Sequence, residues 1–201
     1  MSRPTPSRKK LDQLLDRRNE HPEQLTAIDA QIAHAFAAER AILVLDMCGF
    51  SRLTIRHGIV HYLAMIRRMQ RTVVPLVEAG RGHVVKTEAD NVFATFASVP
   101  DALRTAERIQ ADLARANSVL PEDWDVHVGI GIGYGALLLV GDDDVYGSEM
   151  NLASKLGEDL AEAGDILLTD AAFQRARTKK NFSRKAARLG RLRFAYHARK
   201  R

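Results

Sequence analysis

The sequence has little of what cross-links secreted proteins, namely cysteine, and no long apolar run of the kind that anchors proteins in membranes. Its 201 residues include one cysteine, Cys48, which excludes an internal disulfide or a cysteine-based zinc site and is typical of a reducing compartment. The longest apolar runs, at 41–45 and 136–140, are five residues each, whereas a transmembrane helix needs about 20. The basic N-terminus is not followed by an apolar stretch, so no secretory signal is expected. These absences predict a cytoplasmic protein.

Acidic residues are missing from the C-terminal end. Residues 171–201 contain 12 lysines and arginines and no aspartate or glutamate, which leaves 18 basic against 25 acidic residues in 1–170. Such an end can contact nucleic acid, an acidic protein surface or the phosphates of a nucleotide, or it can simply be solvated. A nucleic-acid-binding domain should also have a basic body, and this body is net acidic, so nucleic acid is not the expected partner.

What is present fits one mixed domain with appendages. The length and the apolar content of 46% suffice for one α/β core and exclude a disordered chain. Residues 9–20 and 22–39 have helical apolar spacing, and residues 41–45 are typical of a strand buried on both faces. Further helices are expected at 51–79, 101–117, 147–162 and 171–177, and further strands at 83–87, 92–96, 126–134, 136–140, 166–169 and 191–197.

The order of these elements predicts the fold class. Strands 126–134 and 136–140 should form a pair around the glycines at 133–135, as strands 83–87 and 92–96 do around residues 88–91. The result is an α+β sandwich of the ferredoxin-like, split βαβ kind. We expect a disordered leader at 1–8, N-terminal helices at 9–39, the main domain at 40–197 and a basic tail at 198–201.

Two aspartates mark the expected centre of the chemistry. Asp46 follows the buried strand and precedes a turn into a helix, and Asp90 lies in the first hairpin turn. In a split βαβ fold this hairpin lies beside the first strand, so both carboxylates should reach the same place. Paired carboxylates suit two divalent cations roughly 3.5–4 Å apart at a phosphate site. The alternative for either residue alone is an aspartate that caps the backbone of a turn.

Three segments together resemble the catalytic domain of class III nucleotide cyclases. They share the family's motif order and spacing over about residues 40–170. The segments are ILVLDMCGFS at 42–51, VKTEAD at 85–90, and GIG at 129–131 followed by DVYG at 144–147 and NLASK at 151–155.

The resemblance implies a homodimer with a nucleoside triphosphate across its interface, whose 3′-hydroxyl attacks the α-phosphate and releases pyrophosphate. It implies that Asp46, Asp90 and the carbonyl of Met47 hold two Mg²⁺ or Mn²⁺ ions, and that Phe50 contacts substrate. The other subunit would supply four further residues. Lys86 and Asp144 match the pair that reads the base, Asn151 matches the residue that orients the ribose, and Lys155 stands where the family has an arginine over the transition-state phosphate.

Departures from the family pattern concern two positions. Lys155 replaces a planar, bidentate donor with a point charge on a flexible stem, which predicts slow turnover. Ala89 stands where glycine is usual, and a positive φ there would cost on the order of 1 kcal/mol.

Four residues are equal candidates for a C-terminal phosphate ligand, namely Lys185, Arg188, Arg191 and Arg193.

The motifs are compatible with more than one base in the nucleoside triphosphate substrate. A lysine donor and an aspartate acceptor fit adenine and cytosine equally, argue against guanine and mildly disfavour uracil. The short chain with no sensor region is similar to the stand-alone bacterial pyrimidine cyclases of the Pycsar anti-phage system, which make cyclic UMP or cyclic CMP for a separate effector. We therefore expect a pyrimidine cyclase. The alternatives are an adenylate cyclase and a pseudocyclase, a dimeric module whose catalysis has decayed.

Overall fold

A computed structural model describes residues 6–190 and 192–200. Its sheet has the order β2-β3-β1-β4-β6-β8-β7, and β5 pairs with β4 at the side. The strands are β1 (Ala37–Met47), β2 (His83–Glu88), β3 (Asn91–Phe96), β4 (Val128–Val140), β5 (Asp144–Tyr146), β6 (Ile166–Thr169), β7 (Phe182–Leu189) and β8 (Leu192–Arg199).

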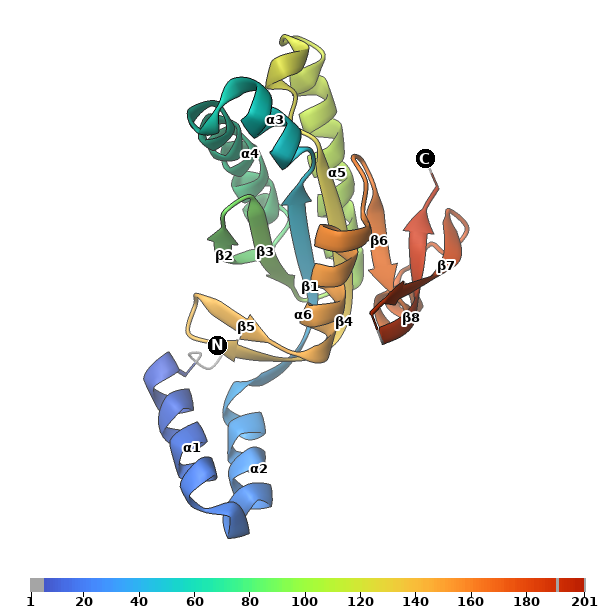
Figure 1. Cartoon of the computed structure of the whole chain (residues 1–201). Coiled ribbons are helices and arrows are strands. Elements are labelled where there is room, and N and C mark those ends of the chain that lie inside the picture. Colours follow the sequence, from blue (N-terminus) through green and yellow to red (C-terminus); the bar gives the residue numbers. More distant parts are fainter. Residues whose placement is uncertain (1–5, 191, 201) are drawn as a thin grey trace.

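Helices cover both faces of this sheet, and α1 and α2 extend from one end of it (Figure 1). The helices are α1 (Arg8–Glu20), η1 (Pro22–Gln24), α2 (Leu25–Phe36), α3 (Phe50–His57), α4 (Ile59–Ala79), α5 (Val99–Asn117), η2 (Glu122–Trp124), α6 (Ser148–Ser154), η3 (Lys155–Leu160) and α7 (Asp170–Arg175). Among the described residues, no helix combines the length and the apolar character needed to cross a membrane.

The central strand β1 explains the continuous apolar run. Leu43 and Leu45 pack into the core that α4 and α5 cover, whereas Ile42 and Val44 pack into the core on the α6 side. Alternate residues of a strand point to opposite faces, so a strand buried on both faces is apolar throughout. The predicted strand at 41–45 is confirmed, and so is the α+β fold class.

The predicted strand pair around the glycines at 133–135 is wrong. The segment is one long strand, β4, which pairs with β1 from Ala37↔Leu138 to Met47↔Val128. Its real hairpin partner is β5. The backbone of α6 packs directly on Gly133, where an added Cβ would be 2.6 Å from the carbonyl oxygen of Glu149, and at Gly135 the nearest atom is Cγ of the Glu149 side chain, at 2.9 Å. They mark close helix approach and not a turn.

Other boundaries differ from the sequence prediction. The expected helix at 51–79 is two helices, because Gly58 has φ +81° between α3 and α4. The strand β7 was not expected, and β8 continues to Arg199, into the expected tail. At the other end, α1 begins at Arg8 and β1 at Ala37, three residues before the expected domain boundary. Residues 1–5 of the expected leader lie outside the described residues.

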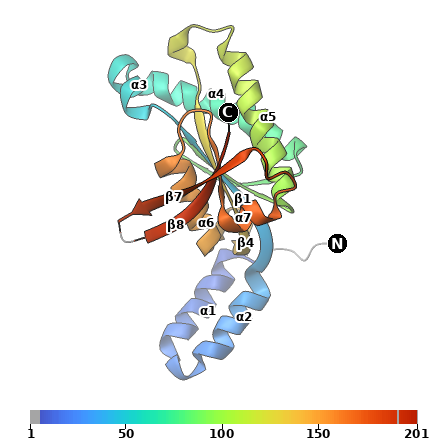
Figure 2. The ribbon, with the colours of Figure 1, turned by 90° about the vertical axis from the view of Figure 1, so that its right-hand side faces the viewer.

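Two appendages flank this sandwich. The α1–α2 hairpin extends from one end of the sheet, and the β7–β8 hairpin lies at its side (Figure 2). Leu11 of α1 and Ile28, Ile32 and Phe36 of α2 pack on Val140 at the end of β4. The helical hairpin is therefore held against the β4–β5 turn.

Candidate active site

Asp46 and Asp90 line one cleft, as expected from the topology. β3 pairs with β1 up to Leu45↔Val92, which brings the β2–β3 turn beside the end of β1. The cleft has a volume of about 880 Å³ and is also lined by Met47, Tyr62 and Glu158. The two predicted metal ligands, from segments more than 40 residues apart, thus meet at one end of the sheet.

The electrostatics of the cleft is dominated by uncompensated negative charge. Burial, the nearby Asp90 carboxylate and Glu158 raise the pKa of Asp46 to about 7. Burial also raises the pKa of Glu158. The hydroxyl of Tyr62 donates to Oδ2 of Asp90, and burial together with this bond raises the pKa of the phenol. Among the described residues that line the cleft there is no lysine or arginine, so a bound cation would relieve the repulsion.

The donor set fits a magnesium or manganese ion. Carboxylate oxygens are the ligands that these hard cations prefer, and Mg²⁺ commonly takes one or two carboxylates and completes its shell with water and substrate phosphates. In the described part of the chain, no group of three or more histidine, cysteine, aspartate or glutamate side chains forms a ready-made metal site. Asp46 and Asp90 therefore suit a site that substrate completes, with Met47 beside them in the cleft lining.

Both turns around the cleft use left-handed backbone. Gly49, between β1 and α3, has φ +93°, and Ala89, just before Asp90, has φ +49°. Residue 89 thus has the positive φ that would favour glycine, and alanine occupies it at a cost of about 1 kcal/mol relative to glycine. Phe50 begins α3, but its side chain lies outside what the structure describes.

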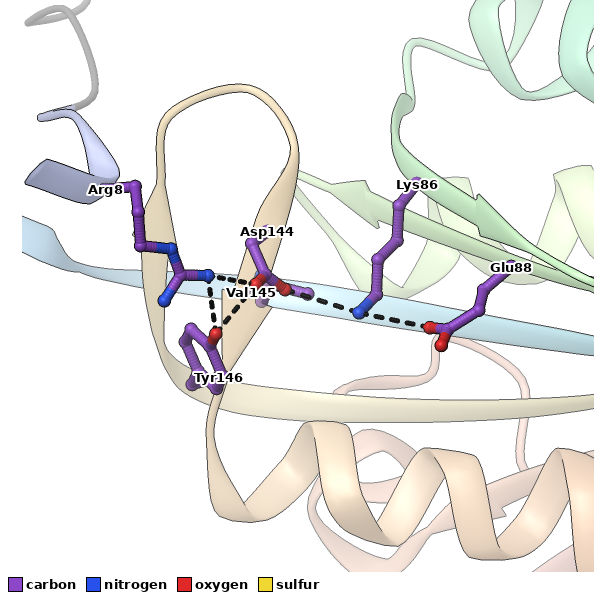
Figure 3. Close-up of polar contacts among 6 residues, drawn as sticks. All are labelled: Arg8, Lys86, Glu88, Asp144, Val145 and Tyr146. Atoms are coloured by element: carbon purple, nitrogen blue, oxygen red, sulfur yellow. Dashed lines mark hydrogen bonds and ion pairs between the residues drawn. The ribbon is translucent and has the colours of Figure 1, made fainter.

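A second cluster surrounds the expected base-reading pair. Nζ of Lys86, on β2, lies 3.4 Å from Oδ1 of Asp144, on β5, and 3.4 Å from Oε2 of Glu88. Oδ2 of Asp144 accepts from Arg8 and from the hydroxyl of Tyr146 (Figure 3). Sequence reasoning found Lys86 and Asp144 and missed Arg8 and Tyr146. No local signal could connect Arg8 to a residue 136 positions away.

Asn151 and Lys155 lie on one stretch of helix. Asn151 is exposed on α6, and its carbonyl accepts from the backbone N–H of Lys155, where a π-helical segment, η3, begins. Nζ of Lys155 lies 2.8 Å from Oδ2 of Asp159. The expected i,i+4 relation is thus present in the backbone, and the lysine is held by a carboxylate of its own helix.

The predicted site residues thus fall into separate groups within one chain. The cleft around Asp46 and Asp90 is not lined by Lys86, Asp144, Asn151 or Lys155. Of the C-terminal phosphate candidates, Lys185 and Arg188 lie on β7 and Arg193 lies on β8. Arg191 lies outside the described residues. Glu158 in the carboxylate cleft was not predicted, because nothing in the run KLGEDL distinguishes it from a solvated helix face.

Comparison with known proteins leads to one group of enzymes. No protein family model matches the chain. A protein of Rhizobium meliloti (strain 1021), named "Putative adenylate cyclase 3", is 33% identical over 134 residues, which are 67% of this chain and 22% of that protein. This chain therefore spans about a fifth of that relative's length.

Solved structures share the fold over most of the chain. The adenylate/guanylate cyclase/hydrolase from Silicibacter pomeroyi is 26% identical, with a TM-score of 0.71, and the match covers 82% of this chain and 98% of that one. The non-canonical dimeric guanylyl cyclase domain of the RhoGC fusion protein from the aquatic fungus Blastocladiella emersonii is 14% identical, with a TM-score of 0.66, over 81% of this chain and 97% of that one. The second likeness shows the shared fold alone.

Proposed function

We propose that this chain, which has the fold of class III adenylate/guanylate cyclase catalytic domains, is a nucleotide cyclase. It would convert a nucleoside triphosphate into a 3′,5′-cyclic nucleotide and pyrophosphate. The observation that carries the proposal is the meeting of Asp46 and Asp90 in a cleft with no lining lysine or arginine among the described residues. A cleft of that charge binds a polyanion only together with cations.

The residues of the cleft have separate tasks in this proposal. Asp46 and Asp90, with the carbonyl of Met47, would hold two Mg²⁺ or Mn²⁺ ions, which supply charge neutralisation of the triphosphate and a lower pKa for its attacking 3′-hydroxyl. Tyr62, which donates to Asp90, orients that carboxylate. The protein's own contribution is mainly positioning, because phosphoryl transfer needs little covalent chemistry from side chains.

We propose further that two chains share each site. The carboxylate cleft lacks Lys86, Asp144, Asn151 and Lys155 in its own lining, so a second copy is needed to bring base, ribose and phosphate contacts to the cations. A group of exposed apolar side chains on α3 and α4 is available for such contact, since large apolar surface on a single chain often marks an interface. It consists of Ile55, Ile59, Val60 and Leu63.

A pyrimidine is our proposed base, with UTP or CTP as substrate and a separate effector that responds to cyclic UMP or cyclic CMP in anti-phage signalling. The support is the resemblance to bacterial pyrimidine cyclases, and the polar edge formed by Lys86 and Asp144 fits cytosine as well as adenine. The alternative is an adenylate cyclase, which the name of the Rhizobium meliloti relative favours.

The identity of the product tests both the proposed cyclase activity and the proposed pyrimidine base. Purified protein with Mn²⁺ and an equimolar mixture of ATP, GTP, CTP and UTP is expected to make a cyclic pyrimidine nucleotide at least about tenfold faster than cyclic AMP, since a tenfold ratio needs roughly 1.4 kcal/mol of selective binding. Mass spectrometry of the products provides the measurement. Dominant cyclic AMP would overturn the pyrimidine assignment and keep the cyclase, whereas no cyclic product with any nucleotide would overturn the cyclase.

Lys155 distinguishes an enzyme from a pseudocyclase. Its exposed ammonium is positioned by Asp159. If it acts on the transition-state phosphate, Lys155→Ala should lower kcat by at least about tenfold with little change in KM, because the contact is made mainly in the transition state. Lys155→Arg should keep or raise kcat, because the planar guanidinium can donate twice.

The control for this pair is Lys10→Ala, which removes a lysine from exposed α1. Steady-state kinetics of all three variants provides the comparison. Equal kcat in Lys155→Ala and wild type would remove Lys155 from the mechanism. Nucleotide binding without product in wild type and in Lys155→Arg would support the pseudocyclase.

A further inference from the structure

A second cavity lies between the end of α4 and the first turns of α5. It has a volume of about 550 Å³, within the range of small-molecule sites, and Leu76 and Ala79 of α4 form its apolar part. Leu76 and Ala106 of α5 belong to the same buried core, so the two helices that enclose the cavity are fixed against each other. None of the residues that we place in the cyclase site lines this cavity, so it is a separate site.

The carboxylates that line this cavity are already paired with arginines. Asp101 accepts a hydrogen bond from Nη2 of Arg104, which also lines the cavity. Oε1 of Glu107 lies 2.9 Å from Nη2 of Arg199, which comes from β8 and does not line it. The negative charge in the lining is therefore neutralised by Arg104 and Arg199, and it is not available to the other arginines there.

Two further arginines, Arg81 and Arg108, line the cavity with unpaired guanidinium groups. Within residues 6–190 and 192–200, neither guanidinium has a hydrogen-bond or ion-pair partner. Arg81 follows Gly80 at the end of α4 and has φ +63°, a backbone conformation that favours glycine after a helix. Since arginine is charged at any pH that the folded protein meets, the cavity has two uncompensated positive charges.

Thr105 adds a buried hydroxyl that lacks a protein partner. The residue is 4% exposed and lines the cavity, and its hydroxyl makes no hydrogen bond to the described part of the chain. Gly80 leaves room beside it, because a Cβ there would be 2.0 Å from Oγ1 of Thr105. Buried polar groups in folded proteins are nearly always hydrogen-bonded, so a molecule bound in the cavity is the expected partner of this hydroxyl.

On these observations we propose that the cavity binds a small molecule that carries a phosphomonoester. Such a group has a charge of about −1.5 to −2 near pH 7 and three accepting oxygens, which match two unpaired guanidinium groups and one hydroxyl. A carboxylate has a single charge and two oxygens, so it leaves part of this donor set unused. Leu76 and Ala79 provide apolar surface for the organic part of the ligand. The proposal does not depend on the cyclase function.

The experiment measures binding of phenyl phosphate, inorganic phosphate and phenylacetate by isothermal titration calorimetry. Divalent cations are absent and the ionic strength is constant, because a cleft without cations repels these anions. Wild type should bind one phenyl phosphate per chain, at least about tenfold more tightly than phenylacetate and more tightly than inorganic phosphate. Arg81→Gln and Arg108→Gln should each weaken phenyl phosphate binding by at least about tenfold, because each removes a charge-assisted hydrogen bond.

Thr105→Val separates ligand binding from folding, because valine keeps the shape of threonine and lacks the hydroxyl. Without ligand, this variant should have a higher Tm than wild type, since a buried hydroxyl without a partner is removed. Its phenyl phosphate binding should be several-fold weaker. Arg67→Gln, which removes another exposed arginine of α4, is the matched control and should bind as wild type does.

Three results would overturn the proposal. The first is no binding of phenyl phosphate by wild type, or equal binding by wild type, Arg81→Gln and Arg108→Gln. The second is tighter binding of phenylacetate or inorganic phosphate than of phenyl phosphate, which would exclude an organic phosphate as the ligand. The third is a lower Tm of ligand-free Thr105→Val, which would show that the hydroxyl already has a partner in the folded chain.

Discussion

Replacing Asp46 or Asp90 by asparagine is expected to lower cyclic nucleotide production by at least about 100-fold. Asparagine keeps the shape of aspartate but removes the charge that holds the cations, and loss of one preorganised electrostatic contact to a transferring phosphoryl group typically costs 10²–10³ in kcat. Both residues line one cleft to which Glu158 and Glu162 add two further carboxylates. The measurement is product formation in Mn²⁺, together with the Mn²⁺-induced shift in Tm, which should vanish in both variants.

The same variants separate a site effect from unfolding. Without metal, Asp46→Asn should be at least as stable as wild type, because a carboxylate facing Asp90 and Glu158 has been neutralised. Asp16→Asn, an exposed substitution on α1, is the matched control and should keep full activity. Full activity of Asp46→Asn and Asp90→Asn, or full activity of wild type in excess chelator, would contradict the metal site.

Mixing two inactive variants tests whether two chains share each active site. Asp46→Asn protein mixed with Asn151→Ala protein should recover activity, because a dimer of one chain of each kind contains one intact pair of half-sites. Exchange of subunits must be demonstrated independently, for example by differently tagged chains. No recovery after demonstrated exchange would place the whole site within one chain.

The second large effect is on stability. Gly131→Ala is expected to lower the free energy of unfolding by at least about 3 kcal/mol, at the upper end of overpacking costs. A Cβ at Gly131 would lie 2.1 Å from the carbonyl oxygen of Ala153 and 2.7 Å from the backbone nitrogen of Gly157. Backbone cannot move aside as a side chain can, so α6 and η3 would have to lift from the sheet.

The matched control is the same substitution at Gly135, four residues further along β4. At Gly135 the nearest atom to an added Cβ is Cγ of Glu149, at 2.9 Å, which belongs to a side chain and not to the backbone. Gly135→Ala should therefore cost less than Gly131→Ala, although the Glu149 carboxylate is held by Tyr134 N–H and by the hydroxyl of Thr169. Equilibrium unfolding in urea measures both. Equal costs for the two variants would show that the contact between η3 and β4 is looser than described.

Much of the carboxylate site could be predicted because its signals are local. Asp46 follows a run of five apolar residues that only a doubly buried strand explains, and Asp90 lies in a turn between two short strands. Placing them together required only that the hairpin lie beside the first strand, which the pairing of β3 with β1 confirms. The positive φ of Ala89 in this turn agrees with the glycine that is usual at this position in the resembling family.

The local sequence signal was misleading at the glycines at 133–135, where a turn was expected. In a sequence, glycine marks a turn and a close approach equally well, and the two differ only in what lies opposite. Gly133 faces the backbone of α6, and the strand continues straight through residues 133–135. The hairpin expected around residues 133–135 was wrong because the neighbouring helix, and not a turn conformation, required the missing side chain at Gly133.

The sequence by itself thus determined the fold class and the meeting of Asp46 and Asp90, since both depend on residue type and on neighbours within a few positions, whereas Lys86 and Asp144 were named only through the family resemblance. Only the tertiary structure decided how Asp144 is used. Arg8 lies 136 residues away and reaches it because Leu11 packs on Val140 and Pro6 bonds to Gly141. Such contacts depend on how apolar surfaces of distant segments are buried together, and that information is distributed over the whole chain.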